Sequence, residues 1–171
     1  MGRRVGYRVV VGLVAGVAWL SSGSEARAQE TRVEARAFAD WQRDLRDRSP
    51  EARAKAAEAL GRFGPGAVPL LTPALGDPEL TVRRAAAEAL RAIGPAVVPA
   101  MIRVLESSDV RIRANAVVVL GGLGPAARDA VPSLARALKD ANPRVRELAT
   151  EAIDRITSTD GSYSTAPLNC H

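Results

Sequence analysis

The sequence predicts an all-α fold: a right-handed α-solenoid of about eight helices arranged as antiparallel hairpins. Two observations favour this fold class. The dipeptide Gly64-Pro65 recurs 30 residues on as Gly94-Pro95 and again as Gly124-Pro125, and a fixed period of this length is typical of a stack of similar units. Between these dipeptides, apolar residues recur three or four positions apart, which is the spacing of one helix face.

Residues 1–28 have the pattern of a secretory signal peptide. Basic residues precede a short apolar run, Val9–Leu20, and the small residues Ala26 and Ala28 suit the pockets of a signal peptidase. The run is too short to cross a membrane as a helix. We therefore expect cleavage after Ala28, a mature chain that begins near Gln29, and a location in the periplasm or outside the cell.

The stretch before the first whole unit is predicted to be a half repeat. Stepping forward by 30 residues places Phe38, Trp41 and Leu45 in register with apolar residues of the next unit. The segment Thr31–Glu34 has the pattern of a capping box, in which two side chains bond the free amide groups of a helix start. We expect the aromatic side chains to cover the exposed end of the stack.

Each of the three whole units is predicted to contain two helices. The first helix of a unit has apolar residues at matching positions, such as Ala52, Ala56, Leu60 and Phe63, then Val82, Ala86, Leu90 and Ile93. The second helix is shorter, with Val68, Leu71 and Leu75, then Val98, Met101 and Leu105, then Val131, Leu134 and Leu138. Ser49-Pro50 and Asn142-Pro143 predict helix starts, and the Gly-Pro dipeptides predict helix ends. The third unit has three extra residues between Pro125 and Pro132, so its turn should be longer.

A final helix over residues 143–157 completes a repeat region that is predicted to span residues 29–157. The tail, residues 158–171, has no periodicity and is expected to be disordered. Cys170 is the single cysteine, so it can form a disulfide only with another molecule, which stays an open alternative. Cys170 and His171 supply two ligands where a closed metal site usually needs four. We expect no metal and no cofactor.

The charge distribution argues against nucleic acid as a partner. The formal net charge is +5, but residues 1–28 contribute a net +3, which leaves 20 basic and 18 acidic residues in the rest of the chain. A nearly balanced chain lacks the electrostatic footprint of a protein that binds the nucleic-acid backbone. We expect a monomer with no nucleic-acid partner and no stable membrane span.

Aspartates are followed six residues later by arginines in three segments: Asp47 to Arg53, Asp77 to Arg83, and Asp140 to Arg146. With the alanine-rich helices and the Gly-Pro turns, these segments resemble the HEAT-repeat family, particularly the short bacterial HEAT-like repeats first associated with phycobilisome lyases. The resemblance covers about residues 31–157 and implies that the six residues form a ladder between neighbouring units. The third unit departs from the pattern, because Ser107 stands where an aspartate is expected. Asp109 could replace it only with a shifted geometry.

Several kinds of catalytic site are excluded from the repeat region. No histidine precedes His171 and no cysteine precedes Cys170, which removes Ser-His and Cys-His nucleophiles and histidine-based metal sites. HEAT-like deoxyhypusine hydroxylases bind iron through His-Glu pairs, and this chain has none. A recurring column of carboxylates is interpreted as a solvated helix face: Glu58, Glu88 and Glu151. We expect a protein that is not an enzyme.

The resulting hypothesis is an exported, non-catalytic scaffold that binds another protein. One alternative is a structural or regulatory component of the cell envelope without a discrete site, and a lyase-related enzyme ranks third. The resemblance to HEAT-like stacks implies that the second helix of each unit lines the concave side. On that helix Arg103 and Arg136, followed by Glu106 and Lys139, face away from the predicted core, so the two arginines should bind an acidic segment of a partner. The apolar run Val117-Val118-Val119 is the second candidate surface.

Overall fold

The computed structural model describes residues 37–158, which form helices and turns without a β-strand. The residues at 37–44 are helical, and seven further α-helices follow: α2 (Pro50–Gly61), α3 (Val68–Ala74), α4 (Leu80–Ile93), α5 (Val98–Val104), α6 (Val110–Gly122), α7 (Val131–Ala137) and α8 (Pro143–Thr157). The predicted all-α solenoid is confirmed. The signal peptide with Ala26 and Ala28, the capping box and the tail beyond Ser158 lie outside the described residues.

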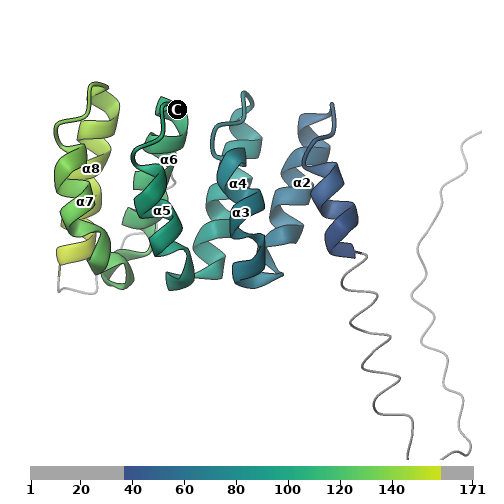
Figure 1. Ribbon diagram of the computed structural model, residues 1–171, viewed down its shortest axis with the longest axis horizontal. Coiled ribbons are helices and arrows are strands. Elements are labelled where there is room, and N and C mark those ends of the chain that lie inside the picture. The colour runs from purple at the N-terminus through teal and green to yellow at the C-terminus, as the bar shows by residue number, and fades with distance from the viewer. Residues whose placement is uncertain (1–36, 159–171) are drawn as a thin grey trace, which may run out of the picture. The chain divides into compact units, whose positions relative to one another are not determined.

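The helices form two rows (Figure 1). In one row α2 packs on α4, α4 on α6 and α6 on α8, and in the other row α3, α5 and α7 follow one another. Each unit is thus a hairpin whose first helix contacts the first helix of the next unit. A hairpin cannot bury its apolar face alone, and stacking gives it a neighbour to pack against.

Side-chain caps begin three of these helices. Ser49 Oγ accepts a hydrogen bond from the Ala52 backbone N–H at 3.3 Å, and Asn142 Oδ1 accepts one from the Arg144 N–H at 2.9 Å. Proline follows both caps at the first helical position, where its missing N–H costs nothing. These two helix starts agree with the prediction from sequence. Asp109, which the sequence suggested as a ladder residue, caps α6.

The Gly-Pro dipeptides end the first helix of each unit. Gly64, Gly94 and Gly124 have positive φ angles of 68°, 84° and 56°, a conformation that glycine adopts without the steric penalty of a Cβ atom. A short 3-10 helix follows each glycine: η1 (Gly64–Ala67), η2 (Pro95–Val97) and η3 (Gly124–Ala130). The predicted longer turn of the third unit is η3, which has seven residues where η1 has four and η2 has three.

The core is aliphatic and runs through all the units. Its largest fully buried side chains include Leu60, Leu71, Leu75, Leu90, Met101, Leu120, Leu134 and Ile156. At the N-terminal end, the rings of Phe38 and Phe63 meet edge to face with centroids 5.3 Å apart. Trp41 and Leu45 are partly buried against the same core. These residues therefore cover the first unit, as expected of a half repeat.

The run Val117-Val118-Val119 is buried, so the expectation of an exposed apolar surface there is wrong. Val117 and Val119 have no exposed surface and Val118 is 9% exposed. The reason is the position of α6, which packs against α4, α5 and α8. A helix enclosed on several sides can be apolar around most of its circumference and still expose no apolar patch.

Candidate functional site: ladder and exposed surface

Arg53 on α2 and Asp77 before α4 form the first step of a ladder between units. Arg53 Nε and Nη2 each donate to one carboxylate oxygen of Asp77 at 2.8 Å, and the two side chains are 13% and 11% exposed. Burial alone would raise the pKa of Asp77, but the hydrogen bonds from Arg53 and from the Glu79 backbone lower it below its usual value. The step is a bidentate ion pair that joins the first unit to the second.

A second step of the same geometry joins the third unit to α8. Arg113 Nε and Nη2 donate to the Asp140 carboxylate at 2.8 and 2.9 Å. The hydrogen bonds from Arg113 hold the pKa of Asp140 below its usual value despite partial burial. Arg113 was not among the predicted ladder residues, because no aspartate stands six positions before it. Its 30-residue register with Arg53 and Arg83 was the available signal.

Each ladder position also bonds within its own turn. The aspartate or serine accepts a hydrogen bond from the backbone N–H two residues later, at 2.8 to 3.2 Å: Asp47, Asp77, Ser107 and Asp140. Six residues on, the Nη1 group of an arginine donates to two carbonyl oxygens of that turn: Arg53, Arg83, Arg113 and Arg146. The six-residue spacing in the sequence therefore reflects this local contact. The ion pairs between units are made by two of these arginines, Arg53 and Arg113, each with the aspartate of the next unit.

Three of the predicted ladder residues make only the local contacts within the part of the chain that the structure describes. Asp47 lies in the first turn of the described repeat region, and Arg146 lies on α8, the last described helix. Arg83 lies in the middle, where Ser107 supplies no carboxylate, and Arg83 has no ion pair among residues 37–158. Asp109 does not replace the missing group, because it accepts from the Arg111 backbone at 2.8 Å and pairs with the Arg111 guanidinium at 3.0 Å.

Small residues bring two pairs of helices close together. A Cβ atom placed on Gly61 would lie 2.9 Å from the Cβ of Ala89, and one on Gly121 would lie 3.0 Å from that of Ala152. The equivalent position in the second unit is Arg91, whose side chain reaches α6. A Cβ atom placed on Gly122 would lie 2.6 Å from the Nε atom of Arg91. Accordingly, α4 packs less extensively on α6 than on α2. This arginine in place of glycine was not predicted, although positions 61, 91 and 121 are equivalent in the 30-residue register.

A buried hydrogen bond crosses the same middle joint. Asn115 on α6 is 3% exposed, and its Nδ2 donates to the backbone carbonyl of Leu75 at 2.8 Å. Leu75 follows α3, so the bond ties the third unit to the first, 40 residues away in the sequence. A buried carbonyl without a donor costs free energy, which gives this asparagine a structural role. Nothing in the local pattern around Asn115 predicted it.

The predicted partner-binding residues lie on or directly after α5 and α7 and are exposed: Arg103, Glu106, Arg136 and Lys139. The guanidinium of Arg136 lies 3.6 Å from the Glu106 carboxylate, with the two side chains 68% and 77% exposed, and donates to Ser133 Oγ at 3.2 Å. Arg103 and Lys139 form no ion pair within residues 37–158. The surface therefore combines one weak ion pair with two uncompensated cations.

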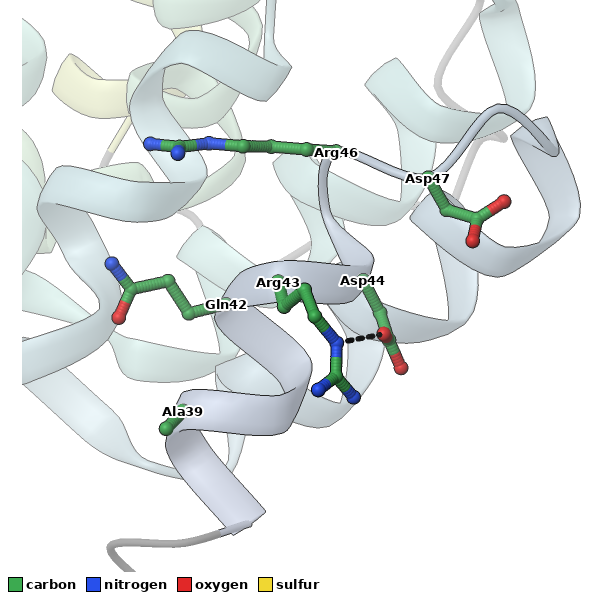
Figure 2. A pocket seen from close by; sticks show the side chains of 6 residues that line it. All are labelled: Ala39, Gln42, Arg43, Asp44, Arg46 and Asp47. Carbon is green, nitrogen blue, oxygen red and sulfur yellow. Dashed lines mark ion pairs between the residues drawn. The ribbon is translucent and has the colours of Figure 1, made fainter.

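A shallow hollow lies at the first described helix (Figure 2). Of its charged residues, Arg43 lies 3.5 Å from Asp44, and Arg43 also lies 3.2 Å from Asp40, which does not line the hollow. Figure 2 shows that Arg46 and Asp47 extend to opposite sides of the turn, so their charges do not converge on one point. This arrangement gives the hollow no concentrated charge with which to select a ligand.

Neither a metal cluster nor a single spanning helix is found in the described part of the chain. No three His, Cys, Asp or Glu side chains of residues 37–158 are placed to hold a metal ion together. No single helix in that range is long and apolar enough to cross a membrane. The two segments that pass this test as a pair, Leu80–Ile93 and Pro95–Val104, are bent by 112° at the break between them.

The fold and the ladder define a repeat protein, an α-solenoid of helical hairpins in which arginine-aspartate pairs join two of the three described joints. The HEAT repeat pattern matches residues 42–107 and 98–166, which together exceed half of the sequence, so the chain belongs to the HEAT-repeat family. No curated protein sequence matches the chain significantly.

Two solved structures are similar to parts of the chain. The complex of CpcE and CpcF of phycocyanin lyase from Nostoc sp. PCC7120 matches with a TM-score of 0.54 and 23% identity, covering 71% of this chain and 79% of that one. An engineered protein matches with a TM-score of 0.44 and 22% identity, over 77% of this chain and 40% of that one. The likeness to the first structure shows a shared HEAT-like helical fold.

Proposed function

We propose that the chain is an exported, non-catalytic HEAT-repeat scaffold that binds an acidic segment of a protein partner through the exposed surface of α5, α7 and the turns that follow them. The observation that carries the proposal is the unpaired positive charge of this surface. Arg103 and Lys139 have no acidic partner among residues 37–158, and Arg136 has only Glu106, at 3.6 Å and largely in water. Exposed guanidinium groups with few internal bonds are free to bind carboxylates in bidentate geometry.

The arrangement of the repeats supports this choice of surface. The second helices α5 and α7 present exposed arginines, Arg103 and Arg136, at positions 33 residues apart. Stacked units place equivalent side chains in a column along the array. Charge in this row increases along the chain, because α3 has no charged residue and α5 and α7 have one arginine each. Export is proposed on the pattern of residues 1–28 alone.

The test is a binding titration with a partner captured from an envelope extract. The double variant Arg103→Glu with Arg136→Glu should weaken binding by ten- to a hundredfold, because it reverses two charges at the surface. A matched control makes the same charge change on the other row, at Arg62 and Arg84, which are exposed. Far-UV circular dichroism of all variants should match that of the natural chain.

The outcomes separate the proposal from its alternatives. Loss of affinity in the first double variant alone supports the α5–α7 surface. Equal loss in both variants would indicate a general charge effect, and unchanged affinity would exclude these two arginines. A structural envelope component without a discrete site predicts no saturable partner at micromolar concentration, and a lyase-related enzyme predicts turnover on a substrate panel.

A further inference from the structure

Arg83 is a buried arginine whose Nε atom has no hydrogen-bond partner among residues 37–158. The residue is 8% exposed, and its Nη1 group donates to the carbonyl oxygens of Asp77 and Pro78 at 2.7 and 2.8 Å. A buried polar group without a partner costs free energy, and more so when it is charged.

The neighbouring joints show what this edge of the guanidinium binds. In both Arg53 and Arg113, Nη1 makes the same two local bonds, and Nε and Nη2 hold a carboxylate at 2.8 to 2.9 Å. At the middle joint Ser107 keeps the local role of the aspartate by accepting from the Asp109 backbone N–H at 3.2 Å. The hydroxyl is shorter than a carboxylate group, so Ser107 cannot supply the two oxygens that the other joints have.

We propose that the Nε and Nη2 edge of Arg83, beside Ser107, is a binding site for a small monocarboxylate anion of the formate class. Such an anion has the two oxygens at the spacing that the two neighbouring arginines bind, and its negative charge matches the positive charge of Arg83, which forms no ion pair among residues 37–158. The Ser107 hydroxyl also has a hydrogen that it can donate to a bound carboxylate.

A second observation places this site at the joint whose first helices pack least extensively on each other. Both buried side-chain atoms without a partner among the described residues, Arg83 Nε and Arg91 Nε, belong to α4, and α4 packs less extensively on α6 than on α2. A bound carboxylate would supply the ladder step that this joint lacks. The proposal concerns the joint itself and does not depend on the α5–α7 surface.

Thermal unfolding of the purified full chain tests the site, with sodium formate compared with sodium chloride at equal ionic strength and pH. Formate at about five times its Kd should raise the melting temperature by about 2 to 4 °C. The variant Ser107→Asp places a carboxylate in the site, so it should melt higher without formate and lose the response. The control Ser108→Asp adds the same charge at the neighbouring exposed position and should keep the response.

A spectroscopic readout identifies the residue directly. In an NMR spectrum of arginine Nε–H groups, the Arg83 signal should move as ¹³C-formate is added, while the Arg53 and Arg113 signals should stay, because their edges are already occupied. The Arg83 signal can be assigned through Arg83→Lys or, if that variant does not fold, through its shift in Ser107→Asp. An equal formate response in the natural chain and in Ser107→Asp would overturn the proposal, and so would an Arg83 signal that does not move.

Discussion

Replacing Asp77 with alanine removes the first ladder step and measures what one step contributes to stability. The change deletes two charge-assisted hydrogen bonds from Arg53, both at 2.8 Å, and one from the Glu79 backbone N–H at 2.9 Å. The Arg53 and Asp77 side chains are 13% and 11% exposed, so water can replace these bonds only in part.

The expected loss follows from this geometry. Breaking a fully buried ion pair by removing one partner costs about 3–5 kcal/mol, and losing one hydrogen bond to a charged group costs about 1.5–3 kcal/mol. Arg53 keeps two acceptors, the carbonyl oxygens of Asp47 and Arg48, so its guanidinium is not left without partners. We therefore expect Asp77→Ala to lower the free energy of unfolding by about 2–4 kcal/mol.

Urea unfolding followed by far-UV circular dichroism measures this loss, provided that the dependence on urea, the m value, is unchanged. The matched control is Ser107→Ala at the equivalent position of the middle joint. Its hydroxyl accepts one backbone hydrogen bond at 3.2 Å, so the expected loss is about 1 kcal/mol or less. Equal losses in the two variants would refute the reasoning, because they would show that the bond within the turn, and not the ion pair between units, carries the stability.

Three further predictions concern packing, pH and processing. Gly61→Ala should destabilise the chain by about 1–3 kcal/mol because the new Cβ would press on α4, whereas Gly66→Ala, with nothing within 4 Å, should change stability little in urea unfolding. The lowered pKa values of Asp77 and Asp140 mean that their contribution is complete above the unfolded value of about 3.9 and is lost as pH falls through the folded values. Urea midpoints should therefore drop below about pH 4, and constant midpoints there would contradict the ladder geometry. Intact mass of the exported protein should show a chain that begins at Gln29, and a product that retains residues 1–28 would contradict processing.

The sequence predicted the features that depend on local geometry. Gly64, Gly94 and Gly124 end helices with positive φ because only the backbone of that one turn is involved. The same holds for the cap at Ser49, whose side chain bonds an amide three residues away. The irregularity at Ser107 was also visible, because a repeat shows a departure from its own pattern.

Features that depend on which neighbour covers which helix face could not be predicted in the same way. The burial of Val117–Val119 follows from the enclosure of α6 by three helices, which the spacing of apolar residues within α6 does not encode. The side chain of Asn115 bonds a residue 40 positions away, and no local pattern specifies that partner. Arg91 occupies the register of two glycines, but only the structure shows that its side chain lies over Gly122.

The arginine at position 91, where the neighbouring units have glycine, has a mechanical consequence. In a stack of units, we expect an applied bending or twisting load to deform the least extensively packed joint first. The close helix contacts at Gly61 and Gly121 lie at the outer joints, so we expect strain to concentrate between α4 and α6. A ligand bound only to units on the C-terminal side of this joint would be unaffected by its deformation. A ligand bound to units on both sides would be stretched or released when the joint deforms.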